Sequence, residues 1–183
     1  MSANLLLYGA NGYTGDLIAR LAVNQGLRPI LAARNSQKVA LLATELGLEY
    51  RAFALDDMAI DSALADIAVV LHCAGPFSQT SAPMVAGCLR SQAHYLDITG
   101  EISVFEEVAA QDSRAKTAGV MLLPGVGFDV VPSDCLAAHL KRRLPSATQL
   151  AIGFQALGRV SRGTATTMVE GQHQKGRVGV MEF

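Results

Sequence analysis

Short apolar runs alternate with amphipathic stretches along the first two thirds of the chain. The runs that read as β-strands lie at residues 5–8, 29–33, 49–54, 68–73, 94–97 and 120–123. Stretches with helical spacing separate them, at residues 12–25, 36–46, 58–65, 81–91 and 102–118. Gly26, Gly47 and Gly119 follow helical stretches, where a left-handed C-terminal residue is expected. The strand runs are brief and apolar throughout, which is typical of strands covered by helices on both faces.

This alternation predicts an α/β fold. Strands joined through helices form a parallel sheet with right-handed crossovers. We therefore expect a doubly wound parallel-sheet Rossmann domain over residues 1–124, with strand order 3-2-1-4-5-6.

Residues 125–183 have a different pattern. A glycine-containing loop over residues 124–129 precedes a predicted helix at 132–144, a strand at 150–156 and a helix at 163–174, with Thr164 as its possible cap. This stretch is too short to form a good core of its own. We expect it to be the start of an incomplete second domain for substrate binding or dimerisation, either a fragment, a truncated product or a domain that a partner completes.

Composition narrows the class of protein. The chain has 183 residues, is 50% hydrophobic and 17% charged, and carries a net charge of -1. That composition is globular, and the scattered Lys and Arg residues argue against a nucleic-acid partner. The three cysteines have no metal or redox spacing, so we expect no metal site and a reducing compartment. Without a signal peptide or an apolar run of about 20 residues, we expect a cytoplasmic protein with no membrane span.

A glycine-spaced turn follows the first predicted strand. Gly9, Gly12 and Gly15 lie between that strand and the next helical stretch. Such a turn brings backbone amides and a helix N-terminus to the pyrophosphate of a dinucleotide. Gly9 would allow the turn, Gly12 the approach of the phosphates, and Gly15 close packing of helix and strand. The sequence thus predicts a dinucleotide site.

The end of the second strand indicates which dinucleotide is bound. An NAD site usually has a carboxylate there, whereas this chain has Arg34, followed one helical turn later by Lys38. A guanidinium can bind a 2′-phosphate with two hydrogen bonds, so we expect NADP, although Arg34 could also be a solvated residue. Asp56 and Asp57 could contact the adenine edge or cap a helix.

The turn after the fourth predicted strand lies at the carboxyl edge of the sheet, where ligands bind in doubly wound folds. Gly75 and Pro76 shape this turn, and Phe77 could flank the nicotinamide or its ribose; an ordinary strand-to-helix turn is the alternative. His72, within an apolar strand, is expected to be a buried, hydrogen-bonded core residue.

Carboxylates follow the fifth and sixth predicted strands at the same edge. Asp97 or Asp129 could contact the substrate or assist a proton transfer, and Asp129 could instead hold its loop. Glu101 and Asp134 could cap or charge the first turns of helices. We expect Tyr95 in the core, and Cys135 buried in its helix because no base is placed to activate it.

Together these segments resemble the saccharopine dehydrogenase-like oxidoreductases, and in particular the branch of trans-acting enoyl reductases. The resemblance covers almost the whole chain and rests mainly on residues 8–15, 73–77, 95–101 and 124–134, with a weaker match at 163–167. It implies an NADP-binding Rossmann domain, and a second α/β domain that begins after Asp134. The residues that it places at the cofactor are Gly9, Ala10, Asn11, Gly12, Tyr13, Thr14, Gly15, Ala74, Gly75, Pro76 and Phe77.

Two functions remain open. An NAD(P)-dependent oxidoreductase would transfer hydride to a small-molecule substrate, an imine or an enoyl compound. A non-catalytic NADP sensor or scaffold would use the same domain for binding alone. Short-chain dehydrogenase chemistry is disfavoured, since no Tyr has a Lys four residues later. An unfinished sheet edge favours a possible homodimer through the C-terminal segment.

Overall fold

The computed structural model describes residues 4–128 and 130–153. Its strands form one parallel sheet in the order β3-β2-β1-β4-β5-β6, which confirms the predicted order. The strands are β1 (Leu5–Tyr8), β2 (Ile30–Ala33), β3 (Tyr50–Ala52), β4 (Val69–His72), β5 (His94–Asp97) and β6 (Leu122–Leu123).

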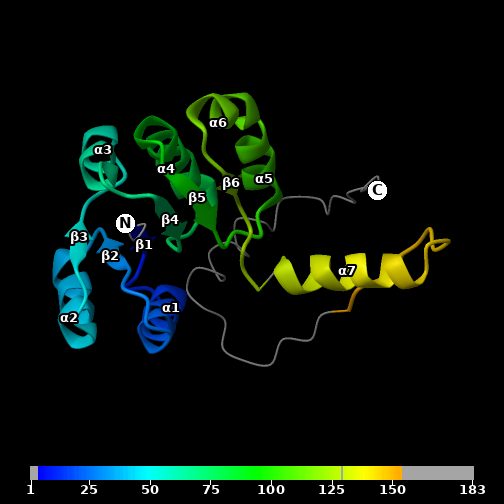
Figure 1. Cartoon of the computed structure of the whole chain (residues 1–183), viewed down its shortest axis with the longest axis horizontal. Helices are drawn as coiled ribbons and strands as arrows, with labels where there is room; N and C mark the ends of the chain where they lie inside the picture. The colour runs from blue at the N-terminus through cyan, green and yellow to red at the C-terminus, as the bar shows by residue number, and fades with distance from the viewer. Residues whose placement is uncertain (1–3, 129, 154–183) are drawn as a thin grey trace.

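Helices cover both faces of this sheet. In Figure 1, α1 and α2 lie below the strands, and α3 to α6 lie above them. The helices are α1 (Tyr13–Asn24), α2 (Ser36–Leu46), α3 (Asp57–Leu64), α4 (Phe77–Ser91), α5 (Ile102–Ala109), α6 (Asp112–Ala118) and α7 (Val131–Arg143). Two apolar cores result, one beneath α1 and α2 and a larger one beneath α3 to α6. The predicted doubly wound Rossmann fold is therefore confirmed.

The direction of winding reverses between β1 and β4. The two strands pair in parallel, with Tyr8 opposite His72 at their carboxyl ends, and β2 pairs on the other side with Ala32 opposite Tyr8. Helices leave β1 and β4 toward opposite faces, so a crevice forms outside these strand ends. This crevice is the expected ligand position of the fold.

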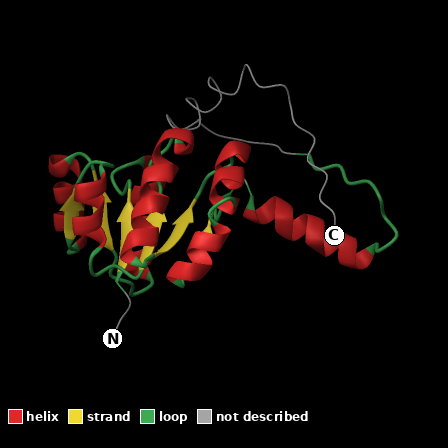
Figure 2. Ribbon diagram, turned by 90° about the horizontal axis from the view of Figure 1, so that it is seen from above, coloured by secondary structure: helices red, strands yellow, loops and turns green. Residues whose placement is uncertain are grey.

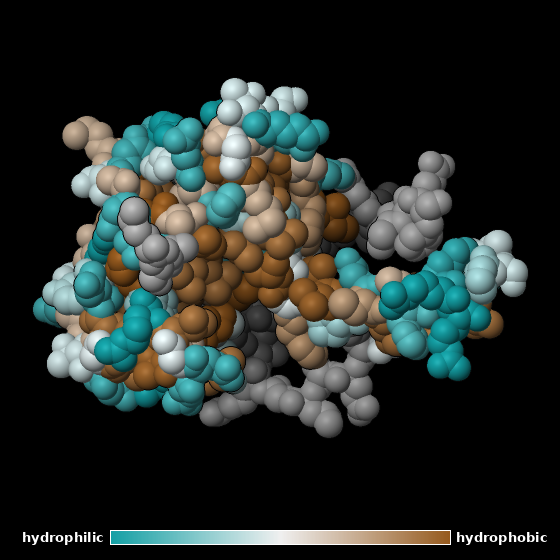
Figure 3. Space-filling view, viewed as in Figure 1, coloured by the Kyte–Doolittle hydropathy of each residue, from teal (hydrophilic) through white to brown (hydrophobic). Residues whose placement is uncertain are grey.

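Burial along β4 and β5 alternates, unlike burial along β2. Val70, His72, Tyr95 and Asp97 face the larger core and are buried, whereas the residues between them are partly exposed. In β2 every residue is buried. Helices α1 and α2 thus cover one face of the sheet over β1 and β2. Over β4 and β5 the same face is less covered. Figure 3 shows apolar side chains gathered between the upper and lower helices, with polar residues over the helices themselves.

Several boundaries differ from the prediction. The helix expected at 102–118 is two helices, because α6 begins anew at Asp112, whose acidic side chain favours a first helical turn. Helix α4 begins at Phe77, one turn before the predicted residue 81, directly after Pro76. The glycines at the predicted helix ends do adopt left-handed conformations, with φ of 78° at Gly26, 64° at Gly47 and 71° at Gly119.

Beyond β6 the chain leaves the sheet. Figure 2 shows α7 extending away from the strands, and only Ala137 of this helix is buried. Cys135 is exposed, so the expectation of a buried cysteine is wrong, because α7 lies away from the sheet and its two cores. Residues 150–153 form no strand, and the rest of the predicted strand at 150–156, the predicted helix at 163–174 and Thr164 lie outside the described residues.

The described residues, 4–128 and 130–153, contain neither a membrane-spanning helix nor a metal-binding cluster. None of the helices there is long and apolar enough to cross a membrane. No group of His, Cys, Asp and Glu side chains in that part of the chain is arranged to hold a metal ion.

Candidate functional site

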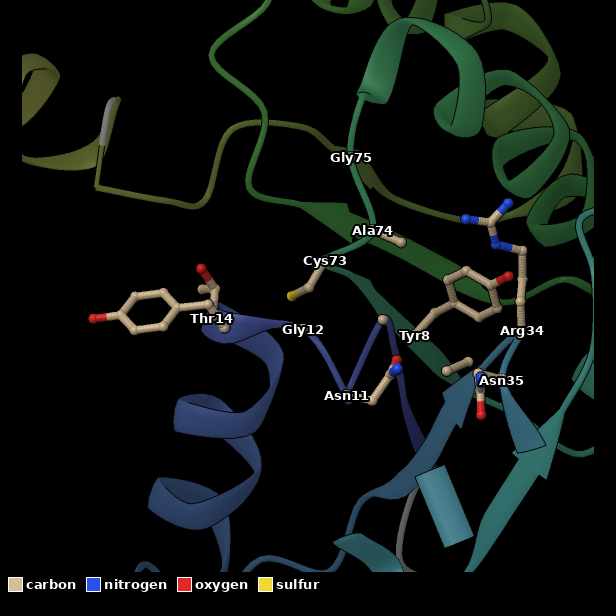
Figure 4. Close-up of a pocket in the computed structure, with 12 residues that line it drawn as sticks. Tyr8, Asn11, Gly12, Thr14, Arg34, Asn35, Cys73, Ala74 and Gly75 are labelled. Atoms are coloured by element: carbon tan, nitrogen blue, oxygen red, sulfur yellow. The ribbon is translucent and has the colours of Figure 1, made fainter. Parts of the chain in front are cut away.

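A groove of about 320 Å³ opens at the carboxyl ends of β1, β2 and β4, at the point where the winding reverses. Figure 4 shows its walls coming from three loops that are far apart in the sequence. The residues that line it are Tyr8, Gly9, Asn11, Gly12, Tyr13, Thr14, Ala33, Arg34, Asn35, Cys73, Ala74 and Gly75.

Close approaches explain the glycines of the turn, most strongly Gly9 and Gly15. Gly9 has φ of 84°, and a Cβ there would lie 2.8 Å from the backbone nitrogen of Ala74. A Cβ on Gly15 would lie 2.8 Å from Cα of Ala10, so this glycine lets α1 pack against the end of β1. A Cβ on Gly12 would lie 3.2 Å from the carbonyl oxygen of Gly9 and would crowd the turn. The predicted roles of Gly9 in the turn and Gly15 in packing agree with these contacts.

The N-terminus of α1 opens into the groove without a side-chain cap. Its N-cap is Gly12, which has no side chain, and Tyr13 and Thr14 of the first turn line the groove. The first amides of a helix have no intrahelical acceptor and carry a partial positive charge. This end of α1 can therefore hold an anion such as a pyrophosphate.

The N-terminus of α4, by contrast, is already occupied by an acidic side chain. The Glu101 carboxylate accepts hydrogen bonds from the amide of Phe77 at 3.0 Å and from the amide of Ser78 at 2.8 Å. Sequence reasoning expected Glu101 to serve its own helix, whereas the carboxylate caps a helix more than 20 residues earlier in the chain. Of these two helix ends at the carboxyl edge, α1 is the one available to a phosphate.

Arg34 forms the far wall of the groove. It is exposed, directly follows β2, and lies beside Tyr8 in Figure 4. Burial raises the pKa of the Tyr8 phenol to about 12, and the positive charge of Arg34 opposes this rise. Asn35 caps α2 by accepting a hydrogen bond from the amide of Lys38 at 2.9 Å. Lys38 is exposed and does not line the groove.

The loop between β4 and α4 forms the third wall. Ala74 and Gly75 line the groove, as does Cys73, whose thiol pKa burial raises to about 12. Pro76 does not line the groove. Phe77 turns into the core, where it is 9% exposed and its ring meets the edge of His72 with centroids 5.4 Å apart.

His72 supports this loop from below. Its Nε2 lies 3.0 Å from the hydroxyl oxygen of Thr80, and that hydroxyl donates to the carbonyl oxygen of Ala74 at 2.7 Å. The ring is fully buried, and burial lowers the pKa of His72 to about 3, so the imidazole is neutral at physiological pH. The expectation of a buried, hydrogen-bonded core histidine is confirmed.

Asp97 lies at the end of β5 and is fully buried. Its Oδ1 accepts hydrogen bonds from the amides of Thr99 and Gly125, both at 2.9 Å, and its Oδ2 accepts one from the hydroxyl of Tyr95 at 2.7 Å. The carbonyl oxygen of Asp97 also accepts from the amide of Val126 at 2.7 Å. The carboxylate thus joins the loops that follow β5 and β6. Tyr95 is a core residue, as expected, and burial beside Asp97 raises its pKa.

The remaining predicted residues fall in different places. Ala10 and Gly15 are buried behind the turn and do not line the groove. Asp129 lies outside the described residues. Asp56 caps α3 by accepting a hydrogen bond from the amide of Ala59 at 3.0 Å, which is the structural alternative considered for it. Asp134 lies in the first turn of α7.

Several lining residues were missed by sequence reasoning. Tyr8, Ala33, Asn35 and Cys73 each stand at, or just after, the carboxyl end of a strand. Ligands of doubly wound sheets bind at these ends, so the position itself was a usable signal. What the sequence did not show is that the Tyr8 ring lies between the turn and Arg34.

The groove fits an NADP molecule in its chemistry. It offers an uncapped helix N-terminus for the pyrophosphate and, across the groove, an exposed guanidinium suited to a further phosphate. Gly9, Gly12 and Gly75 keep side chains out of the space between these walls.

Comparison with known proteins agrees with this fit. Residues 5–123 match the saccharopine dehydrogenase NADP binding domain. A trans-acting enoyl reductase of Mycobacterium leprae is 33% identical over 150 residues, which cover 77% of this chain and 36% of that protein. One from Mycobacterium tuberculosis is 30% identical over 149 residues, with 76% and 36% covered. The chain thus spans about a third of the length of these relatives.

Solved structures show the same fold. A saccharopine dehydrogenase from Saccharomyces cerevisiae superposes with a TM-score of 0.66 and 21% identity, over 79% of this chain and 32% of that one. A triphenylmethane reductase from Citrobacter, solved with NADP(H), superposes with a TM-score of 0.51 and 19% identity, over 63% of this chain and 46% of that one. The predicted cofactor, NADP, is confirmed by the domain match. The chain belongs to the saccharopine dehydrogenase-like family of NADP-binding oxidoreductases.

Proposed function

We propose that this chain holds NADPH for the reduction of a small-molecule substrate, an imine or an enoyl compound, by hydride transfer. The observation that carries the proposal is the groove itself, with an uncapped helix N-terminus on one side and an exposed Arg34 on the other. The relatives that are named trans-acting enoyl reductases add a reaction class, the reduction of an enoyl compound.

Each wall of the groove has a proposed part in binding. The amides at the start of α1 hold the pyrophosphate, and Arg34 holds the 2′-phosphate, with Lys38 adding positive charge nearby. Ala74 and Gly75 form the third wall, which in this proposal lies next to the remaining half of the cofactor. When bound, NADPH supplies the hydride, and this chain's residues contribute orientation and the exclusion of water.

The acid groups divide between two proposed roles. Asp97 is enclosed by three hydrogen-bond donors, which favours a role in holding the loops after β5 and β6. Its predicted contact with substrate stays a prediction. Asp129 follows the loop that Asp97 holds, and we propose it as the residue that contacts substrate or assists a proton transfer.

Three further expectations stay predictions. They are the division of the chain at residue 124 into two domains, a homodimer through residues 125–183, and a cytoplasmic location. The activity and substrate of the relatives come to this chain only as part of the proposal, since the chain matches about a third of their length.

A turnover assay tests the proposal. The folded chain is mixed with NADPH and a panel of imines and enoyl thioesters, and loss of the nicotinamide absorbance is followed together with the mass of the product. Hydride transfer predicts NADPH oxidation with a product two mass units heavier than one panel member. NADPH binding without oxidation on any panel member would contradict it and favour the NADP-binding sensor.

A further inference from the structure

We propose that Glu101 is a positioning residue for the cofactor groove, which it serves by holding the β4–α4 loop from the outside. This inference rests on the proposed function, because it concerns how tightly NADPH is held. Glu101 is not a lining residue of the groove. Its effect is therefore indirect, through the backbone that it binds.

The first step is the pair of bonds that the carboxylate makes. Both of its oxygens are used, one on the amide of Phe77 at 3.0 Å and the other on the amide of Ser78 at 2.8 Å. A carboxylate on the first amides of a helix is stabilised by the partial positive charge there. These amides directly follow Gly75 and Pro76, so they fix the end of the loop whose start lines the groove.

The second step is how Glu101 is itself held. The amide of Glu101 donates to the hydroxyl of Thr99 at 3.0 Å, and the amide of Thr99 donates to the buried Asp97 carboxylate at 2.9 Å. Thr99 and Asp97 are both fully buried. A continuous set of hydrogen bonds therefore runs from the end of β5 to the start of α4.

The third step is that the loop has an independent anchor on its other side. Thr80 donates to the carbonyl oxygen of Ala74 and lies within 3.0 Å of His72 Nε2. The loop from Ala74 to Ser78 is thus held between the core of the sheet and Glu101. With Glu101 removed, the inner anchor at Thr80 remains while the outer bonds to Phe77 and Ser78 are lost. Gly75, which has no side chain, then allows the loop to move.

The Glu101 carboxylate also affects which of two helix N-termini, that of α1 or that of α4, a cofactor phosphate can reach. Glu101 occupies the N-terminus of α4, so of the N-termini of α1 and α4, that of α1 is the one open to a cofactor phosphate. We infer that Glu101 both fixes the wall and directs the phosphates to α1 by excluding them from α4.

The experiment compares Glu101→Ala, Glu101→Gln and a control within the helix that Glu101 precedes, Glu107→Gln, whose side chain is exposed and lies away from the groove. Dissociation constants are measured for NADPH and for adenosine 2′,5′-bisphosphate, which lacks the pyrophosphate and the nicotinamide. Glu101→Ala should weaken NADPH binding within the roughly 5- to 150-fold range of coupling between separate sites, and leave adenosine 2′,5′-bisphosphate unchanged. Glu101→Gln, which keeps one acceptor oxygen, should fall between Glu101→Ala and the wild type.

Amide hydrogen exchange supplies a readout that is independent of ligand. Glu101→Ala should speed exchange at Phe77 and Ser78, with exchange in β1 and β2 unchanged. Unchanged exchange at those two amides, or equal NADPH affinity in Glu101→Ala and wild type, would overturn the inference. Equal loss of affinity for NADPH and for the bisphosphate would also overturn it, since that pattern indicates general destabilisation. If the wild type itself fails to bind NADPH, the proposed function fails, while the exchange data still test the cap.

Discussion

The hydroxyl of Tyr95 donates a 2.7 Å hydrogen bond to Oδ2 of Asp97, with both side chains fully buried in the larger core. Both belong to β5, two residues apart, so both face the same side of the sheet. The phenol thereby satisfies the one carboxylate oxygen that the backbone amides of Thr99 and Gly125 do not reach. A carboxylate at the end of a buried strand is tolerated because both of its oxygens accept hydrogen bonds, from Tyr95 and Thr99 nearby in the sequence and from Gly125 in the loop after β6.

Tyr95→Phe removes this donor and nothing else. The buried carboxylate then lacks a partner on Oδ2, so we expect the free energy of unfolding to fall by about 1–3 kcal/mol. Urea denaturation followed by circular dichroism measures it. Tyr50→Phe is the control, because Tyr50 is an exposed residue of β3 and its change should leave stability within about 0.5 kcal/mol. Equal stability of Tyr95→Phe and wild type would contradict the role of the phenol.

Asp97→Asn separates the two roles open to this residue. Asparagine keeps an oxygen for the two amides, and its NH2 can donate to the Tyr95 hydroxyl, so we expect the fold and NADPH affinity to be spared. Asp97→Ala leaves the three donors unpaired and should destabilise the protein by about 3 kcal/mol or more. Unfolding curves and NADPH titrations of both variants check this.

An NADPH-oxidation assay of the Asp97→Asn variant then distinguishes the two roles open to Asp97. Asp97→Asn with intact NADPH binding but no NADPH oxidation would make Asp97 a residue that touches substrate. Unchanged oxidation would make it a positioning residue for its two loops. Asp129→Asn should lower oxidation without weakening NADPH, and a loss of NADPH affinity there would refute its proposed role.

Gly12→Val should abolish NADPH binding. A Cβ at this position already lies 3.2 Å from the carbonyl oxygen of Gly9, and the two further methyl groups would cover the uncapped amides of α1. Fluorescence titration with NADPH measures the loss. Gly26→Asn is the control, since a Cβ there meets no atom within 4 Å and asparagine tolerates the left-handed conformation. Wild-type affinity for NADPH in the Gly12→Val variant would contradict a pyrophosphate site at the N-terminus of α1.

Acid should destabilise the protein through His72. The folded pKa is about 3 and the unfolded one about 6.5, so the unfolded state binds the extra proton between these values. Stability from this group is therefore complete above about pH 6.5 and is lost as pH falls toward 3, by about 2 kcal/mol at pH 5. Urea denaturation at pH 7 and pH 5 measures it. A variant that cannot titrate, His72→Gln, should lose about 2 kcal/mol less on acidification, and an equal loss in both proteins would contradict the prediction.

The strand pattern was predictable because local signals and the fold agree. Each parallel strand is a short apolar run, and glycines mark the ends of helices at Gly26, Gly47 and Gly119, all with positive φ. The start of α4 was not predictable in the same way. Its first amides are capped by Glu101, which is remote in sequence, so no local residue near Phe77 signals the helix start.

The site was predictable in part for the same reason. The glycine turn and Arg34 are local features with a known chemical use, and both line the groove. Asp97 shows the limit of such reasoning. A carboxylate beside a glycine turn at the sheet edge suggested chemistry, whereas its burial and its three donors depend on Tyr95, Thr99 and Gly125 folding around it.

The position of the 2′-phosphate is tested most directly by Arg34→Ala. Dissociation constants for NADPH and NADH are measured by calorimetry on the folded wild type and on this variant, with Arg114→Ala, an exposed arginine that does not line the groove, as the control. A hydrogen-bonded pair with a charged group contributes about 1.5–3 kcal/mol, so NADPH should weaken by about 10- to 100-fold while NADH changes little. Equal weakening of both cofactors, or no binding of either by the wild type, would contradict the assignment of this groove to NADP.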